Sequence, residues 1–265
     1  MKKNPRPGIS PVWKNTWRLI WFGSILFFLF LFPAPNIYFA KAEKTSGMKI
    51  AQKIDLPPPP PYPINKEGEL LPQLTAEGIL IKDIQSGVIL YEKNAAKRFP
   101  QASTTKIITA LVALDTFSLD EALTVQTVIT AGRVMGLVAG EKITAEALLY
   151  GALVHSANDA AYTLAENYPG GVDRFVEAMN EKAKSLSLTD THFTNPIGFD
   201  DPNHYSTAVD LGKQAIAALR NKTFAKIVGT RAITVSDVTF TYFHPLTNVN
   251  ELLGKISGVS GVKTG

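Results

Sequence analysis

The sequence predicts an α+β fold, with β-hairpins near both ends of the globular part and helices between them. Residues 78–92 and 231–243 each contain two apolar runs separated by polar turn residues, a pattern typical of a hairpin. Between these stretches, apolar residues recur at helical spacing. Apolar residues make up 45% of the 265 residues, enough for the core of one large domain. We therefore expect helices and an antiparallel or mixed sheet.

Each expected element has a local signal. The first hairpin turns at Asp83–Gly87, between two apolar runs. A helix begins near Ser103, because the apolar residues of TTKIITALVAL recur three and four positions apart. Thr144 is the expected N-cap of a second helix in TAEALLYGALVHS. Further helices are expected after Asn158, near residues 172–186 and near residues 207–219, and a strand is expected to start within residues 257–265.

The first 42 residues have the features of an export signal. They hold six basic residues, no acidic residue and an uncharged run of fourteen residues, Leu19–Phe32. Such a run is short for a bilayer span but suits the apolar part of a signal peptide. Small residues at Ala40 and Ala42 favour cleavage after Ala42. The alternative is an uncleaved membrane anchor over Leu19–Ala40, and in both cases the folded part lies outside the cytoplasm.

A proline-rich linker is expected at residues 43–73. Its segment LPPPPPYP, Leu56–Pro63, disfavours helix and central strand and favours an extended polyproline II conformation. From residue 74 onward the pattern is that of a globular domain, which we expect to cover residues 74–265.

Composition excludes several classes of function. The chain has no cysteine, so disulfides and thiolate metal sites are absent. Its four histidines lack the spacing of a zinc hydrolase, and no metal is expected. Because the first 42 residues carry six of the 27 basic residues, the rest of the chain is net −2, with 21 basic and 23 acidic residues. The basic charge therefore does not indicate nucleic-acid binding by the folded part.

A serine and a lysine three residues apart form the first candidate catalytic motif. The pattern S-x-x-K occurs at Ser46, Ser103 and Ser260, but only Ser103 lies at the start of an apolar helix. There, Lys106 shares a helix face with Ser103, and free backbone N–H groups favour a developing anion. By itself the pattern is also compatible with an N-cap serine followed by a surface lysine.

Two more polar motifs follow at domain-scale distances. Ser156 and Asn158 lie at a break between two expected helices, and Lys263, Thr264 and Gly265 form K-T-G. Each triplet is ordinary when taken alone. Their order and their structural settings together match those of serine penicillin-recognising enzymes.

Residues 74–265 resemble the D-alanyl-D-alanine carboxypeptidases among the low-molecular-mass penicillin-binding proteins. The stretches QASTTKIITALVAL, GEKITAEALLYGALVHSANDAA, THFTNPIGFDDPNHYSTAVDLGK and LTNVNELLG also look like that family. One departure is S-A-N where many relatives have S-G-N. The resemblance implies an antiparallel sheet with flanking helices beside a helical region, with the active site in the groove between them.

The resemblance also implies roles for the motif residues. Ser103 is the expected nucleophile toward a stem peptide of peptidoglycan that ends in D-alanyl-D-alanine, and Lys106 is its base. Ser156 is expected to relay a proton to the leaving amine, and Asn158 to position Lys106 and the substrate amide. Lys263 and Thr264 are expected to face the terminal carboxylate, and Gly265 to leave room for the substrate. No cofactor is needed, and β-lactams are the expected inhibitors.

Alternative functions remain within this fold. A class A β-lactamase is disfavoured, because no E-x-x-L-N pattern occurs between Asn158 and Lys263. A DD-endopeptidase would use the same residues to cut crosslinks. A non-catalytic domain that binds the cell wall or senses penicillin would be favoured by a broken triplet, and all three triplets are intact.

The resemblance finally implies that further strands and a helix follow the K-T-G strand. On this reading the 265 residues are a fragment, and the residue after Gly265 would supply the second N–H of the oxyanion hole. Losing one such donor typically costs ~10²–10³ in rate. We therefore expect the fragment to be unstable and feebly active beside the complete reading frame.

Overall fold

A computed structural model of the chain describes residues 20–24, 27, 63 and 73–265. The chain divides into two units, residues 1–58 and 59–265. In the first unit, the described residues 20–24 and 27 are helical. The expected signal cleavage and nearly all of the linker lie outside the described residues. Within the described part, no helix is long and apolar enough to cross a membrane.

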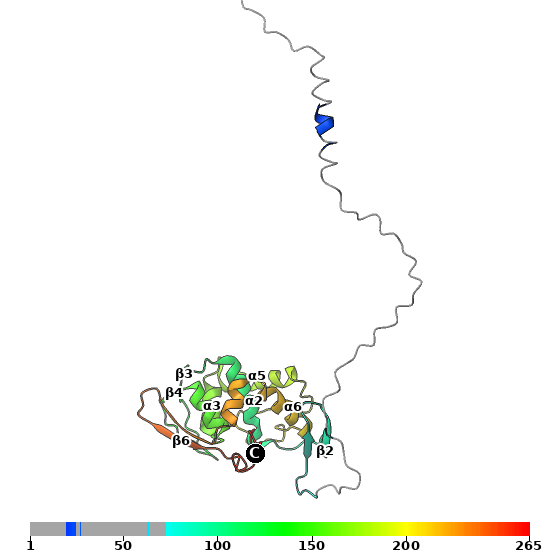
Figure 1. The fold of residues 1–265 in the computed structure, drawn as a ribbon. Helices are drawn as coiled ribbons and strands as arrows, with labels where there is room; N and C mark the ends of the chain where they lie inside the picture. The colour runs from blue at the N-terminus through cyan, green and yellow to red at the C-terminus, as the bar shows by residue number, and fades with distance from the viewer. Residues whose placement is uncertain (1–19, 25–26, 28–62, 64–72) are drawn as a thin grey trace, which may run out of the picture. The chain divides into compact units, whose positions relative to one another are not determined.

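Three antiparallel hairpins provide the strands of the second unit (Figure 1). β1 (Ile79–Lys82) pairs with β2 (Ile89–Lys93), so that Ile79 faces Lys93, which confirms the first expected hairpin. β3 (Ala122–Thr124) pairs with β4 (Lys142–Thr144). β5 (Ala232–Ser236) pairs with β6 (Phe243–Thr247), with Ala232 opposite Thr247.

Helices occupy the middle of the unit, as the apolar spacing predicts. A 3₁₀ turn, η1 (Ala102–Thr105), leads into α2 (Lys106–Thr116). The other helices are α3 (Ala145–Leu153), α4 (Asn158–Glu166), α5 (Gly171–Ser185), α6 (Ala208–Leu219) and α7 (Lys222–Val228). Thr144 caps α3 as expected, since its hydroxyl accepts a hydrogen bond from Ala147 N at 3.3 Å.

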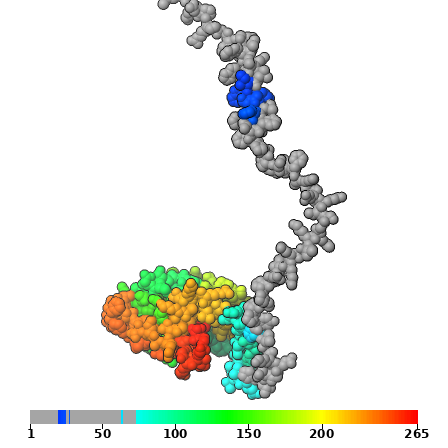
Figure 2. Space-filling model, in the orientation of Figure 1, coloured from blue at the N-terminus to red at the C-terminus, as the bar shows by residue number. Residues whose placement is uncertain are grey.

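The core surrounds α2. Every residue from Lys106 to Ala113 is buried, and α2 packs against α3, α4, α5 and α6. A helix that is apolar on all sides has to lie inside a domain, which explains why other helices surround it. The hairpins β1–β2 and β5–β6 lie at opposite ends of this helical layer (Figure 1). Residues near the C-terminus, red in Figure 2, lie at the surface beside the orange and yellow segments.

Two expected elements are wrong in position or kind. The second strand of the hairpin expected at residues 231–243 begins only at Phe243, because the intervening residues form a loop tied to Asp237. The Asp237 carboxylate accepts hydrogen bonds from the backbone N–H groups of Thr239, Thr241 and Tyr242. Residues 257–265 form no strand with any described residue. Their backbone therefore lacks the ladder of hydrogen bonds that defines a strand.

Candidate active site

The first motif lies in a tight turn against α2. Ser103 is half-buried in η1, and the three-residue turn of a 3₁₀ helix stacks Lys106 directly over it. The Nζ atom of Lys106 lies 3.0 Å from the Ser103 Oγ. The sequence places both residues on one face of a helix, and the structure brings them into hydrogen-bonding contact.

Lys106 has two further hydrogen-bond partners, and both are oxygen atoms that can accept a hydrogen bond but not donate one. Its Nζ lies 2.7 Å from Asn158 Oδ1 and 2.8 Å from the carbonyl oxygen of Ile197. Asn158 is held in this orientation because its Nδ2 donates to Ala131 O at 2.8 Å. A neutral lysine amine has two N–H groups and one lone pair. With both N–H groups donated to these oxygens, the lone pair points at the Ser103 hydroxyl.

The surroundings of Lys106 favour this neutral form. Its side chain is fully buried. Burial, and next the positive charge of Lys263, lower the pKa of Lys106 from 10.5 to about 7, against the opposing effect of Asp159. A substantial fraction of the lysine is therefore neutral near pH 7 and able to accept a proton.

The second and third motifs meet each other. The Nζ atom of Lys263 donates to Ser156 Oγ at 2.8 Å and to the carbonyl oxygen of Thr264 at 2.7 Å. Ser156 has a left-handed backbone with φ 62°, and its side chain points at Lys263 while Asn158 starts α4. Burial, and next the guanidinium of Arg133, lower the pKa of Lys263 to about 8.

The K-T-G residues also approach η1, the turn that contains Ser103. Thr264 and Gly265 are exposed. A Cβ atom added to Gly265 would lie 3.2 Å from Thr104 Cγ2 and 3.3 Å from Gln101 O. All seven candidate residues therefore belong to one compact cluster around Ser103.

Sequence reasoning gave no role to two segments that hold the cluster. Residues 131–137 wrap around the start of α4, where Asn158 N donates to Arg133 O at 2.7 Å. The buried Asp159 carboxylate accepts hydrogen bonds from the backbone N–H groups of residues 135–137. An aspartate directly after Asn158, in the first turn of a helix, is a local signal for such a site.

The second segment is the loop of residues 194–204, which lies in a stretch that carries the family resemblance but for which sequence reasoning gave no role. His204 Nδ1 accepts from Thr194 N at 3.1 Å, so Nε2 carries the proton and donates to Thr105 Oγ1 at 2.7 Å. Gly198 has φ 90°, and a Cβ there would lie 2.0 Å from Ala102 O. The loop thus presses against η1 and presents the Ile197 carbonyl to Lys106. The turn sequence NPIG is a local signal for a loop at this position.

Comparison with known proteins gives the family. Residues 65–265 match the family described as D-alanyl-D-alanine carboxypeptidase, Peptidase_S11. This chain belongs to that family. The match confirms the class of enzyme expected from the three motifs, a serine-type D-alanyl-D-alanine carboxypeptidase. Carboxypeptidases of this family act on peptidoglycan peptides that end in D-alanyl-D-alanine and bind β-lactams.

Individual relatives agree with this family. A D-alanyl-D-alanine carboxypeptidase of Streptomyces sp. (strain K15) is 37% identical over 212 residues, 73% of this chain and 73% of the relative. A D-alanyl-D-alanine endopeptidase of Pseudomonas aeruginosa is 34% identical over 225 residues, 83% of this chain and 71% of the relative. The crystal structure of the Streptomyces K15 DD-transpeptidase matches with a TM-score of 0.69 at 37% identity, covering 74% of this chain and 82% of that chain. This likeness confirms the α+β, transpeptidase-like fold.

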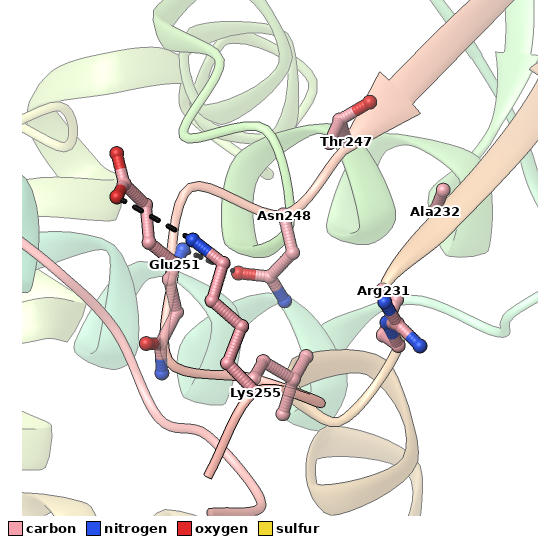
Figure 3. Close-up of a pocket in the computed structure, with 8 residues that line it drawn as sticks. Arg231, Ala232, Thr247, Asn248, Glu251 and Lys255 are labelled. Carbon is pink, nitrogen blue, oxygen red and sulfur yellow. Dashed lines mark hydrogen bonds and ion pairs between the residues drawn. The ribbon is translucent and has the colours of Figure 1, made fainter.

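Another hollow of the carboxypeptidase, with a volume of about 510 Å³, contains none of the motif residues (Figure 3). Its lining consists of Arg231, Ala232, Thr247, Asn248, Asn250, Glu251, Leu253 and Lys255. In the part of the chain that the structure describes, no three histidine, aspartate or glutamate side chains lie close enough to hold a metal ion.

Proposed function

We propose that this carboxypeptidase removes the terminal D-alanine from peptidoglycan stem peptides through an acyl-enzyme on Ser103. The observation that carries the proposal is the contact of Ser103 Oγ with the buried amine of Lys106, whose other two partners can only accept hydrogen bonds. A serine hydroxyl is a weak nucleophile until a neighbouring base removes its proton. Lys106 is that base.

The reaction begins when the neutral Lys106 amine takes the Ser103 hydroxyl proton. The Ser103 oxygen then attacks the carbonyl carbon between the two terminal D-alanines. As the carbon–nitrogen bond breaks, the proton that Lys106 took passes through the Ser156 hydroxyl to the leaving amine, and Lys106 returns to its neutral form. Water then attacks the ester carbonyl while Lys106 takes its proton and passes it to the departing Ser103 oxygen. The shortened peptide is released, and Ser103 and neutral Lys106 are regenerated.

Lys263 and Thr264 bind the terminal carboxylate of the substrate. The ammonium group of Lys263 offers a charge-assisted contact suited to a free C-terminus. Asn158 holds the Lys106 amine in place and orients the substrate amide. Gly265, without a side chain, leaves the substrate backbone room along residues 263–265.

The finer cellular assignment is also part of the proposal. This is a family of cell-wall enzymes, generally extracytoplasmic. The basic and apolar N-terminal segment supports export, followed by either release or anchoring on the wall side of the cytoplasmic membrane.

Labelling with a fluorescent penicillin tests the nucleophile. We expect peptide mapping to find the label on Ser103, and Ser103→Ala to abolish labelling without loss of the fold. In Lys106→Ala, the acylation rate at saturating penicillin should fall to near zero. In Lys263→Ala, the main change should be a higher penicillin concentration for the half-maximal rate. A label on Ser46 or Ser260, or equal losses of saturating rate in both lysine variants, would contradict these roles.

A DD-endopeptidase is the second candidate, supported by the similarity to the Pseudomonas aeruginosa endopeptidase. Mass spectrometry of isolated muropeptides after incubation distinguishes the two reactions. Loss of one D-alanine from a monomeric muropeptide indicates carboxypeptidase activity, and splitting of a crosslinked dimer indicates endopeptidase activity.

A further inference from the structure

Two backbone segments, here called the two walls, border the cluster around Ser103. The first wall contains Gly265, which lies against Thr104 and the carbonyl oxygen of Gln101. The second wall contains Gly132, which lies against Asn158, and Asn158 contacts Lys106. Because K-T-G takes the terminal carboxylate under the proposed function, the leaving D-alanine extends toward the first wall. The residue that precedes the two D-alanines then extends toward the wall that contains Gly132.

Arg133 is an exposed cation on that second wall. Its carbonyl oxygen accepts from Asn158 N at 2.7 Å, which fixes its backbone beside the catalytic cluster. Among the described residues, none forms a salt bridge with its guanidinium. The guanidinium lies near enough to Lys263 to lower the pKa of that residue. A second cation beside the site is unfavourable without an anion, so its position suits an anionic ligand.

The segment that carries Arg133 is rigidly fastened. Ala131 O accepts from Asn158 Nδ2 at 2.8 Å, and the buried Asp159 carboxylate takes three backbone N–H groups from residues 135–137. A Cβ added at Gly132 would lie 2.6 Å from Asn158 Nδ2, so this backbone touches the catalytic amide. Arg133 therefore extends from a pre-organised support, which reduces the entropy lost on binding.

An exposed aromatic ring lies next to this support. The added Cβ of Gly132 would lie 4.0 Å from Phe199 Cε1, and Phe199 is 44% exposed. The backbone of Phe199 is held on both sides, since its N–H donates to Asn195 Oδ1 at 3.0 Å and its carbonyl accepts from Asn195 Nδ2 at 3.0 Å. The Phe199 ring thus lies near Gly132, the residue that precedes Arg133 in the chain. A fixed apolar ring and a cation in the same wall match an aliphatic side chain that ends in an acid.

We propose that Arg133 is a specificity-determining residue, which binds a carboxylate at the end of the side chain that precedes the two D-alanines, while Phe199 covers the aliphatic part of that side chain. This inference rests on the proposed function. The preferred substrates are stem peptides with an acidic side chain at that position, and a free ammonium there is disfavoured by like charge.

Two synthetic peptides isolate this contact. Both end in D-alanyl-D-alanine, and the residue before is L-α-aminoadipate in one and its side-chain amide in the other. The wild-type enzyme is expected to favour the carboxylate in kcat/KM by about tenfold, which corresponds to ~1.4 kcal/mol, a usual value for one charge-assisted hydrogen bond. Arg133→Gln removes this preference, and Arg133→Glu reverses it in favour of a peptide with lysine at that position.

Arg231→Gln is the matched control, because Arg231 is an exposed arginine that lines the hollow in Figure 3, and this lining contains none of the motif residues. It removes the same charge and should keep the tenfold ratio. Benzylpenicillin tests which wall is involved, since its carboxylate occupies the K-T-G side. Its acylation rate should change less than about twofold in Arg133→Gln.

The possible outcomes separate the two proposals. If the wild-type enzyme hydrolyses both peptides equally, or if Arg133→Gln lowers both rates by the same factor, the specificity role of Arg133 is overturned while the proposed function stands. A large loss of benzylpenicillin acylation in Arg133→Gln would also overturn it, because the arginine would then serve the terminal carboxylate. If neither peptide is hydrolysed and penicillin does not label Ser103, the proposed function itself fails.

Discussion

Replacing Asn158 by aspartate tests whether Lys106 is the base. The substitution conserves shape but puts a negative charge where Asn158 Oδ1 now lies, 2.7 Å from Lys106 Nζ. A carboxylate at that distance stabilises the ammonium form and is expected to raise the pKa of Lys106 by about 1–3 units. Acylation needs the neutral amine, so the rate at neutral pH falls.

The structure sets the scale of this effect. With a pKa of about 7 instead of 10.5, roughly half of Lys106 is neutral at neutral pH, against about one molecule in three thousand for an ordinary lysine. Raising the pKa from about 7 by about 1–3 units lowers the neutral fraction, and with it the acylation rate at neutral pH, by about 5- to 500-fold. The loss is recovered at higher pH, because the base, once deprotonated, is intact.

The assay is the saturating rate of benzylpenicillin acylation, measured across the pH range from acid to about pH 10. In the wild type the rate rises with pH and reaches half its maximum near the pKa of Lys106, about 7. Asn158→Ala is the control, since both variants lose the donor to Ala131 O but only aspartate adds charge. For Asn158→Asp, the pH of half-maximal rate should be at least about one unit higher than for Asn158→Ala. A smaller difference would refute Lys106 as the base.

Two further predictions concern the loop behind η1. Gly198→Ala should lower the melting temperature and slow penicillin acylation at least tenfold, because φ is 90° and the new Cβ would lie 2.0 Å from Ala102 O, so that the turn has to shift. The second concerns pH, because burial lowers the pKa of His204 from 6.5 to about 4. The unfolded chain gains a proton at higher pH than the folded one, so the stability of the wild type falls as pH drops from about 6.5 to about 4, by up to ~3 kcal/mol. His204→Gln can still donate to Thr105 Oγ1, and its stability should fall less over this pH range. Thermal melts at both ends of the range measure the fall. An equal loss of stability in the two proteins would disprove the idea.

The sequence predicted the elements that repeat a local pattern. The helix after Ser103 and the cap at Thr144 depend on residues within a few positions of one another, so single-chain spacing is enough. The pattern did not distinguish a 3₁₀ turn from an α-helix at residues 102–105, because both bring positions three apart together. It also placed the second hairpin within residues 231–243, whereas the Asp237 carboxylate holds the residues after it in a loop and the second strand begins at Phe243.

The rest of the site depends on contacts between distant segments. Ile197 contributes a backbone carbonyl, which any residue has, so its identity carries no signal of its contact with Lys106. Arg133 is an ordinary exposed residue until the fold brings its segment against Asn158. Short elements such as α7 and the pair β3–β4 have too few residues to establish a period, and only their packing against α3, α4 and α6 explains them.

The chemistry of Lys106 is therefore a property of packing more than of the motif. A lysine with an ordinary pKa at the same spacing from Ser103 would almost always be protonated and could not serve as a base. Lowering the pKa from 10.5 to about 7 costs the folded state about 5 kcal/mol at pH below 7. At this pH Lys106 is an ammonium in both states, but only the folded state buries it. Only the fully packed domain offsets such a cost, through the apolar helices around α2 and the two carbonyl oxygens that take the N–H groups of the amine. Under the proposed function, residues 131–137 and 194–204 therefore support the base, because Ala131 and Arg133 hold Asn158 and Ile197 accepts a hydrogen bond from Lys106.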